Sequence, residues 1–304
     1  MSTRALPSSM ARVTRTERLA IRRHLGRWVR RCHDRGMDRY LHGHAEPVVA
    51  SHAARTVESS AAYLLPHLRP GLRVLDVGCG PGSITLDLAR RVSPGEAVGV
   101  DASAQVVEQA RSAAREAGDE RTTFEVADAM ALPWADDSFD VVHAHQVLQH
   151  VTDPVGLLRE MARVARPGGL VAARDADYEA MTWAPAHPGL TSWLELYRAA
   201  ARGTGAEPDA GRHLLGWAHA AGLTDVTATA SVWCYADEAA RQWWGGQWQR
   251  RAVESGFHDE VLRQGLADEG GIAHVVEGWR AWTSSPDGWF VVVHGEVLAR
   301  VPAG

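Results

Sequence analysis

Residues 74–83 of this chain read Val-Leu-Asp-Val-Gly-Cys-Gly-Pro-Gly-Ser. An apolar run leads into a turn with three glycines, and the residues that follow have the pattern of a helix start. Such a turn lets backbone N–H groups approach a small ligand closely, and the helix N-terminus adds a partial positive charge. The stretch therefore predicts a strand, a ligand-binding turn and a helix, in that order.

Asp76 separates this turn from the turn of a dinucleotide-binding site. Its carboxylate stands just ahead of Gly78, where it would repel a pyrophosphate and favour an ammonium group. Gly82 also comes one position too early for the third glycine of the G-x-G-x-x-G pattern. The turn therefore indicates a nucleoside with a zwitterionic tail, and an NAD-linked oxidoreductase is the less favoured interpretation.

Asp101 ends the next strand-like run, 97–100. In a doubly wound sheet, ligands bind beyond the carboxyl ends of the strands. A carboxylate there can accept hydrogen bonds from both hydroxyls of a ribose. Its position agrees with the nucleoside that the glycine turn indicates.

Strand-like and helix-like runs alternate along the chain, which predicts an α/β fold with a parallel sheet covered by helices on both faces. The helix-like runs span 48–68, 81–92, 104–117 and 157–165. The strand-like runs span 72–77, 97–100, 122–127, 139–143, 169–174, 226–233 and 289–294.

The C-terminal half holds two segments that are too long for plain connections, near 178–222 and 237–288. They are expected to form helical cap insertions. Their tryptophans either wall an apolar substrate pocket or form the core of the cap. These tryptophans are Trp183, Trp193, Trp217, Trp243, Trp244, Trp248, Trp279 and Trp282.

Composition predicts a soluble, cytoplasmic enzyme. Apolar residues make up 45% and charged residues 23% of the 304 residues, and no apolar run is long enough for a membrane span. The arginine-rich start lacks the continuous apolar segment of a signal peptide. Three widely spaced cysteines, Cys32, Cys79 and Cys234, favour a reducing compartment over a disulfide framework.

Residues 1–40 form an arginine-rich N-terminal extension, with eleven arginines and three carboxylates. Such an arm could dock a nucleic acid or an acidic partner. The simpler interpretation is a loosely ordered extension, so that residues 41–304 form the catalytic domain.

The glycine turn and the segments after it resemble the class I S-adenosylmethionine-dependent methyltransferases, in particular the ubiquinone/menaquinone-biosynthesis branch (methyltransferase domain type 11). The resemblance is strong over about residues 40–175 and looser beyond. It implies a Rossmann-like seven-stranded sheet, mostly parallel with one antiparallel strand. The matching segments are residues 74–82, 99–101, 127–129, 138–142, 148–151 and 166–170.

The resemblance assigns roles in binding S-adenosyl-L-methionine. Asp76 and the turn at 78–82 (Gly78, Cys79, Gly80, Gly82) would hold the methionine moiety, and Asp101 with Ala102 the ribose. Asp128 would face the adenine amino group and Ala129 would supply a backbone contact. His145, after the fourth strand, would border cofactor and acceptor. Tyr40 and Arg55 lie in the region that similar enzymes fold over the methionine carboxylate.

A general base is needed only if the acceptor must lose a proton. His145 and His150 are the candidates after the fourth strand. Asp175, Asp177 and Tyr178 are the alternatives after the fifth. Each could instead play a packing or strand-end role.

Two His-x-His pairs raise the question of a metal. His42/His44 and His143/His145 would each lie on one face of a strand, but no cysteine or carboxylate completes a ligand set at familiar spacing. No metal is expected.

The sequence therefore favours an S-adenosylmethionine-dependent methyltransferase whose acceptor is a small molecule, aromatic or polyketide-like. The alternatives are a nucleic-acid or protein methyltransferase that docks through the arginine-rich arm, and a cofactor-binding accessory protein without catalysis. The acceptor atom and the oligomeric state stay open.

Overall fold

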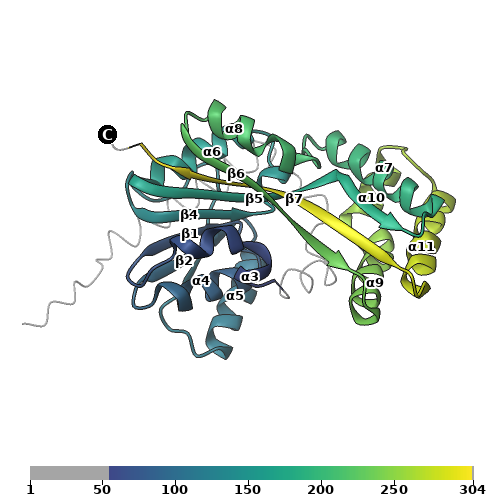
Figure 1. The fold of residues 1–304 in the computed structure, drawn as a ribbon, viewed down its shortest axis with the longest axis horizontal. Helices are drawn as coiled ribbons and strands as arrows, with labels where there is room; N and C mark the ends of the chain where they lie inside the picture. Colours follow the sequence, from purple (N-terminus) through teal and green to yellow (C-terminus); the bar gives the residue numbers. More distant parts are fainter. Residues whose placement is uncertain (1–54, 303–304) are drawn as a thin grey trace, which may run out of the picture. The chain divides into compact units, whose positions relative to one another are not determined.

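A computed structural model describes residues 55–302 of the chain. These residues belong to one compact unit, and they contain a seven-stranded sheet with the order β3-β2-β1-β4-β5-β7-β6 (Figure 1). The strands are β1 (Arg73–Val77), β2 (Glu96–Asp101), β3 (Thr123–Val126), β4 (Phe139–His145), β5 (Ala165–Ala184), β6 (Asp225–Tyr235) and β7 (Trp289–Arg300).

The first five strands are parallel, and β7 runs antiparallel to both of its neighbours, β5 and β6. This confirms the predicted class, a mostly parallel Rossmann-like sheet with one antiparallel strand. Because the order reverses between β1 and β4, the carboxyl ends of these two strands form the switch point where doubly wound sheets bind ligands.

Helices cover both faces of the sheet. On one face α3 (Val57–Ser60), the 3-10 helix η1 (Ala62–His67) and α4 (Ser83–Val92) bury a core with Val74, Val141 and Leu170. On the other face α6 (Pro154–Val164) and α8 (Leu214–Ala220) bury Leu75, Val142 and Val171. The remaining elements are α5 (Ala104–Glu116), η2 (Leu148–His150), α7 (Pro188–Gly203), η3 (Ala210–His213), α9 (Glu238–Glu254), α10 (Gly256–Arg263) and α11 (Glu269–Ser284).

The single helix predicted across 48–68 is wrong for its described part. The chain forms one turn of α-helix, α3, and then η1, with a break at Ala61, whose φ is −146°. Thr56 caps α3 in a reciprocal capping box with Ser59. Pro66 lies inside η1, because a 3-10 turn tolerates a missing N–H that a continuing α-helix would not.

Strand β5 is much longer than the predicted run at 169–174, because it continues beyond the end of its neighbour β4 to Ala184. Strand β7 pairs along this continuation, with Thr182 opposite Val291 and Ala184 opposite Trp289. Strands β6 and β7 extend with it, so these three strands carry the chain from the sheet to α7 and α9–α11 (Figure 1).

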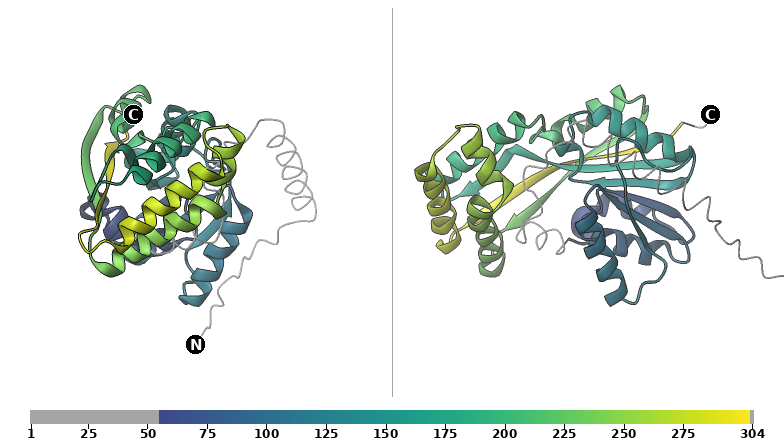
Figure 2. Two further views of the ribbon diagram at one scale, coloured as in Figure 1. Left: turned by 90° about the vertical axis from the view of Figure 1, so that its right-hand side faces the viewer. Right: turned by 180° about the vertical axis from the view of Figure 1, so that it is seen from behind.

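A second hydrophobic core lies between these extended strands and the helices α7, α9, α10 and α11; we call it the aromatic core. Helices α9 and α11 run side by side in it (Figure 2). Trp193 makes edge-on contacts with Trp248 and Trp279 at ring-centroid distances of 4.6 and 4.8 Å. Its large buried members are Trp193, Tyr197, Trp248, Phe257, Trp279, Trp282 and Phe290.

The predicted insertion tryptophans thus have different fates. Four of them, Trp193, Trp248, Trp279 and Trp282, are fully buried in the aromatic core. Trp217 lies on α8 and packs against the core of the main sheet instead. Only Trp243 and Trp244, on α9, reach the cavity described below.

Within residues 55–302, no helix combines the length and the apolar character needed to cross a lipid bilayer.

Candidate active site

The glycine turn, residues 78–82, has the backbone that only glycine adopts without strain. Gly78, Gly80 and Gly82 have φ values of 68°, 54° and 87°. A Cβ on Gly78 would lie 2.4 Å from the side chain of Val147, and one on Gly82 would lie 2.8 Å from Phe124. The turn is therefore packed between Val147, after β4, and the ring of Phe124 on β3. Its backbone lies at the carboxyl end of β1.

Cys79 closes the turn against β2. Its N–H donates to the carbonyl of Val100 at 2.8 Å, and its side chain packs with Leu86 and Phe124. Burial raises the pKa of the thiol well above its ordinary value, so Cys79 is a packed, protonated thiol.

Asp76 is engaged by the protein itself. It is 3% exposed; Thr85 donates to one carboxylate oxygen at 2.6 Å, and His143 Nδ1 lies 2.8 Å from the other. The carboxylate therefore fastens α4 to β4 beneath the turn. Direct contact between Asp76 and the ammonium group of the methionine moiety stays a prediction. Each carboxylate oxygen has a second lone pair that could accept such a bond.

Asp101 lies at the carboxyl end of β2 and keeps part of its surface accessible. It accepts from the N–H of Gly80 at 3.2 Å and from the N–H of Ser103 at 2.9 Å. Its carboxylate is therefore fixed beside the glycine turn, and Ala102 next to it is exposed.

Asp128 and Ala129 follow β3 on the same edge of the sheet, and both are partly exposed. Asp128 accepts from the N–H of Met130 at 2.9 Å, and the N–H of Ala127 donates to the carbonyl of Asp101 at 3.1 Å. The ends of β1, β2 and β3 thus bring the predicted cofactor residues Asp76, Asp101 and Asp128 to one edge, while Tyr40 lies outside the described residues.

These features fit S-adenosylmethionine. The turn offers a backbone cradle that a Cβ would fill, and the carboxylate of Asp101 is fixed beside it while still open to solvent. Beside the cradle α4 begins at Ser83, so its positive end faces the turn.

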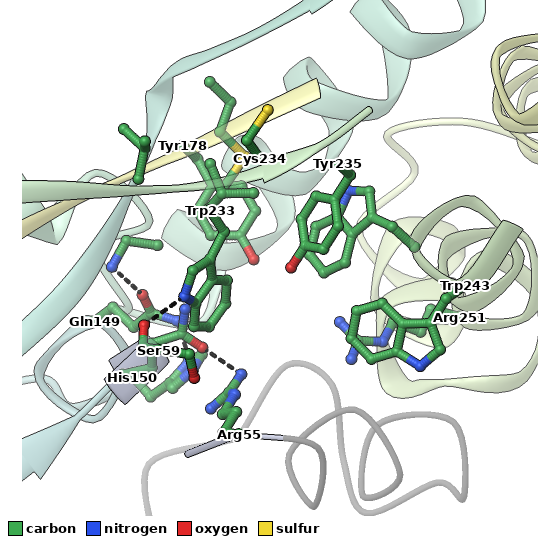
Figure 3. A pocket seen from close by; sticks show the side chains of 16 residues that line it. Arg55, Ser59, Gln149, His150, Tyr178, Trp233, Cys234, Tyr235, Trp243 and Arg251 are labelled. Carbon is green, nitrogen blue, oxygen red and sulfur yellow. Dashed lines mark hydrogen bonds between the residues drawn. The ribbon is translucent and has the colours of Figure 1, made fainter. Parts of the chain in front are cut away.

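A cavity of about 350 Å³ lies beside the carboxyl end of β4 and residues 176–181 of β5 (Figure 3). The segment after β4 separates the cavity from the glycine turn. On one side Val147 packs on Gly78, and its neighbour Gln146 lines the cavity. Its size falls in the range of small-molecule sites. Five aromatic side chains line it: Tyr178, Trp233, Tyr235, Trp243 and Trp244.

The aromatic walls are held by contacts with one another and with neighbouring residues. Tyr235 stacks on Trp244 at 4.5 Å between ring centroids, and Tyr178 stacks on Tyr197 of the aromatic core at 4.0 Å. Trp233 Nε1 donates to the carbonyl of Ser59 at 2.7 Å. The walls are therefore preorganised, which lowers the entropy that binding a flat ligand would cost.

Gln146, at the end of β4, has a left-handed backbone, with a φ of 55°. Its side-chain oxygen accepts from Arg55 at 2.6 Å, and its amide nitrogen lies 3.0 Å from His294 Nε2. A non-glycine residue in this region stores strain that is often found at functional sites. Arg55, predicted at the methionine carboxylate, lies here on the cavity wall and 5.4 Å from the ring of Trp233.

Tyr178 and Met181 reach the cavity because β5 bulges between Asp177 and Thr182. In this bulge the N–H of Ala180 donates to Asp177 at 3.2 Å, and Arg212 grips the same carboxylate with two bonds of 2.7 Å. Asp177 therefore supports the bulge. Bulges re-aim side chains in this way.

Of the predicted bases, His150 and Tyr178 are among the described residues that line the cavity. Burial and the charge of Arg55 lower the pKa of His150 to about 3, so the ring is neutral. Gln149 accepts from the N–H of Ala176 through its oxygen, so its amide nitrogen donates to His150 Nε2 at 2.9 Å. The basic nitrogen of His150 is thus already engaged, which weakens its prediction as a base.

His145 lies on the sheet beside Trp233 and His294, with ring centroids 5.7 and 6.2 Å away, and it does not line the described cavity. Neither ring nitrogen has a hydrogen-bond partner among the described residues. Burial, with the charges of Arg55 and Arg174, lowers its pKa well below the usual value.

Asp175 is fully buried behind Gln149, whose N–H donates to it at 3.1 Å. Burial raises its pKa to about 7, which is the range of a general base. It does not line the described cavity, so its role in catalysis stays a prediction.

No group of histidine, cysteine and carboxylate side chains within residues 55–302 is arranged to hold a metal. His143 points its Nδ1 at Asp76, and the pair His42/His44 lies outside the described residues.

Sequence reasoning did not find Gln146, Trp233, Tyr235 or Arg251, which all line the cavity. Gln146 could have been found as the neighbour of His145 at the end of the fourth strand. Trp233 and Tyr235 alternate on β6, which was a signal for one shared face. Nothing in the sequence marks Arg251, because its position depends on how α9 packs.

Comparisons with known proteins agree with this geometry. Residues 68–240 match a family described as a methyltransferase domain. The chain is 33% identical to an uncharacterized methyltransferase of Schizosaccharomyces pombe over 86% of this chain and 96% of that protein. It is 37% identical to the 27-O-demethylrifamycin SV methyltransferase of Amycolatopsis mediterranei, over 52% of this chain and 56% of that protein.

Among solved structures, the YcgJ protein of Bacillus subtilis has the same fold, with a TM-score of 0.54 and 21% identity over 80% of this chain and 98% of that one. The family match covers more than half of the chain, and the sheet order, the glycine turn and Asp101 agree with it. The chain therefore belongs to the methyltransferase domain family and is an S-adenosylmethionine-dependent methyltransferase.

Proposed function

We propose that this enzyme methylates a small molecule with an aromatic or polyketide-like body, which binds in the cavity beside β4 and β5. The observation that carries the proposal is the set of five aromatic side chains around about 350 Å³, next to the segment that packs on the glycine turn. Flat rings stack favourably on such walls. A folded protein surface or a duplex would not enter a space of this size.

S-adenosylmethionine supplies a methyl group already activated on a sulfonium. The residues of this chain would then position the cofactor and the acceptor and shield them from water. Asp101 and the backbone of the glycine turn would hold the nucleoside and the methionine moiety, and Asp128 the adenine. Arg55 lines the cavity and donates to Gln146, the residue before Val147, which packs on the glycine turn.

Rate acceleration would come mainly from holding the acceptor in line. Alignment of two reacting groups is worth an effective molarity of roughly 10⁵–10⁸ M. Trp233, fixed by its bond to Ser59, and Tyr178, fixed by its stack on Tyr197, would define the acceptor plane and exclude water. None of the described cavity residues offers a disengaged base of suitable pKa, so positioning carries more of the catalysis than proton removal.

The relatives support a small acceptor. One of them is named for methylating a rifamycin. The aromatic lining of this cavity supports the same class of acceptor here.

Two steps test the proposal. Calorimetric titration with S-adenosylhomocysteine is expected to give a one-to-one complex. Cell extracts with and without the gene are then incubated with the enzyme and methyl-labelled S-adenosylmethionine. Label in a small aromatic metabolite is the expected result; label only in protein or nucleic acid would overturn the acceptor class. Binding with no labelled product in any fraction would support a non-catalytic accessory protein.

A further inference from the structure

The charged side chains among the described residues that line the cavity have one sign. Arg55 enters from the segment before α3 and Arg251 from α9, while no Asp or Glu is among the described residues that line it. Figure 3 shows both arginines bordering the space that the aromatic rings surround. The imidazole of His150 is neutral, so it does not offset or add to this charge.

Two phenol hydroxyls share this space. Tyr178 comes from the β5 bulge and Tyr235 from β6, and Figure 3 shows their hydroxyl groups pointing toward the middle of the cavity. Burial raises the pKa of both phenols, while the charges of Arg55 and Arg251 oppose that rise at each of them. Both hydroxyls are therefore donors, and both lie within the field of the two arginines.

A neutral aromatic acceptor would not need this arrangement. Arg251 is only 4% exposed, and its guanidinium lies 5.2 Å from the ring of Trp248, inside the protein rather than in solvent. Two guanidinium groups beside an apolar cavity raise the local concentration of anions and disfavour cations. Phenol donors that face the same space add hydrogen bonds to an anionic oxygen, which are stronger than bonds to a neutral one.

We propose that the acceptor is an aromatic anion, with an ionised oxygen of a carboxylate, phenol or enol bound by Arg251, Tyr178 and Tyr235 while its rings lie against the tryptophans. This inference rests on the proposed function, since it names the charge class of that acceptor. An acceptor that binds in its ionised form needs no base in the site. The proposal therefore accounts for a cavity whose only described histidine has its basic nitrogen engaged by Gln149.

Three naphthalenes with an anionic, a neutral or a cationic group at the same ring position test the proposal: 1-naphthoate, 1-naphthylmethanol and 1-naphthylmethylamine. Each is titrated by calorimetry into the full-length protein saturated with S-adenosylhomocysteine, so that the site for the methionine carboxylate is filled. We expect the naphthoate to bind at least about tenfold tighter than the alcohol, and the amine to bind weakest. Equal affinity of naphthoate and alcohol, or tighter binding of the amine, would overturn the inference.

Arg251→Gln removes the charge, and Arg250→Gln, on the exposed side of the same helix, is the matched control. Arg251→Gln should weaken naphthoate about tenfold and change the alcohol less than about twofold; Arg250→Gln should change neither. Equal weakening of both probes would mean that Arg251 acts by packing and would contradict the proposal. If circular dichroism shows that Arg251→Gln does not fold, the wild-type ranking decides alone.

The two proposals fail differently. Wild-type protein that does not bind S-adenosylhomocysteine refutes the proposed function before any naphthalene is added. Normal binding of S-adenosylhomocysteine with the wrong ranking of the three probes refutes only the anionic acceptor.

Discussion

The half of the sheet around the glycine turn and the extension that carries the aromatic core are built by different means. In the first, β1, β2 and β3 are short strands. Gly78 follows β1, Asp101 ends β2, and Asp128 lies two residues after β3. In the second, β5 and β7 run on past the sheet, and rings from α7, α9, α11 and β7 meet around Trp193. A ligand site can be specified by local backbone geometry, whereas a core requires contacts between segments far apart in sequence.

The same difference applies to the cavity, in which the proposed acceptor would bind. The cavity lies between the two regions and takes Gln146 and His150 from the segment after β4, and Trp243 and Arg251 from α9. In the proposed function, the residues that would contact the acceptor therefore come largely from the extension.

The largest effect is expected in the aromatic core, where two tryptophans of α9 form a matched pair. Trp248 is fully buried, and Trp243 is 37% exposed at the cavity. Trp248→Ala should lower the free energy of unfolding by about 3–5 kcal/mol, and Trp243→Ala by less than about 1 kcal/mol. Urea denaturation measures both. Equal losses would mean that the aromatic core is not the structural element described here.

Gly78→Ala tests the close approach in the glycine turn, and Gly118→Ala is its control, because the two glycines have φ values of 68° and 66°. A Cβ on Gly118 meets nothing within 4 Å, whereas one on Gly78 meets Val147. Gly118→Ala should cost about 1–2 kcal/mol of stability from the backbone alone, and Gly78→Ala about 1–3 kcal/mol more.

Calorimetry with S-adenosylhomocysteine completes that comparison. Only Gly78→Ala should weaken binding. A similar loss in Gly118→Ala would show that strain in general, and not the shape of the turn, controls the affinity.

Asp101→Asn should weaken binding of S-adenosylhomocysteine by roughly 10-fold or more, since a charged acceptor of hydrogen bonds is replaced by a neutral one. Asp119→Asn is the control, because Asp119 also accepts from the N–H two residues ahead, at Arg121, but lies in the turn before β3. Its substitution should leave the affinity unchanged. Identical affinities for all three proteins would remove Asp101 from the donor site.

The last prediction concerns Asp175, whose pKa is raised to about 7 by burial. The folded state then holds a proton between about pH 4 and pH 7 that the unfolded state has lost, so this group makes stability fall as pH rises, by at most about 1.4 kcal/mol per pH unit. Asp175→Asn keeps an acceptor for the N–H of Gln149 and cannot ionise.

The measurement is urea denaturation at pH 5 and pH 8. Relative to wild type, Asp175→Asn should gain stability at pH 8 compared with pH 5. The lowered pKa of His150 acts in the opposite direction, because it makes stability fall as pH falls. This contribution is the same in both proteins, so it cancels when the stability of wild type is subtracted from that of Asp175→Asn. A difference that does not change with pH would contradict the raised pKa of Asp175.

The sequence by itself determined the donor half. Residues 74–83 and Asp101 predicted the strand, turn and carboxylate, because a glycine turn and a strand end are set by residues that are neighbours in the chain. Only the tertiary structure decided the cavity: the length of β5, the bulge that turns Tyr178 inward, and the division of the tryptophans between core and cavity. Trp243 and Trp248 are both tryptophans on α9. Which of them is buried depends only on how the helix packs against other elements.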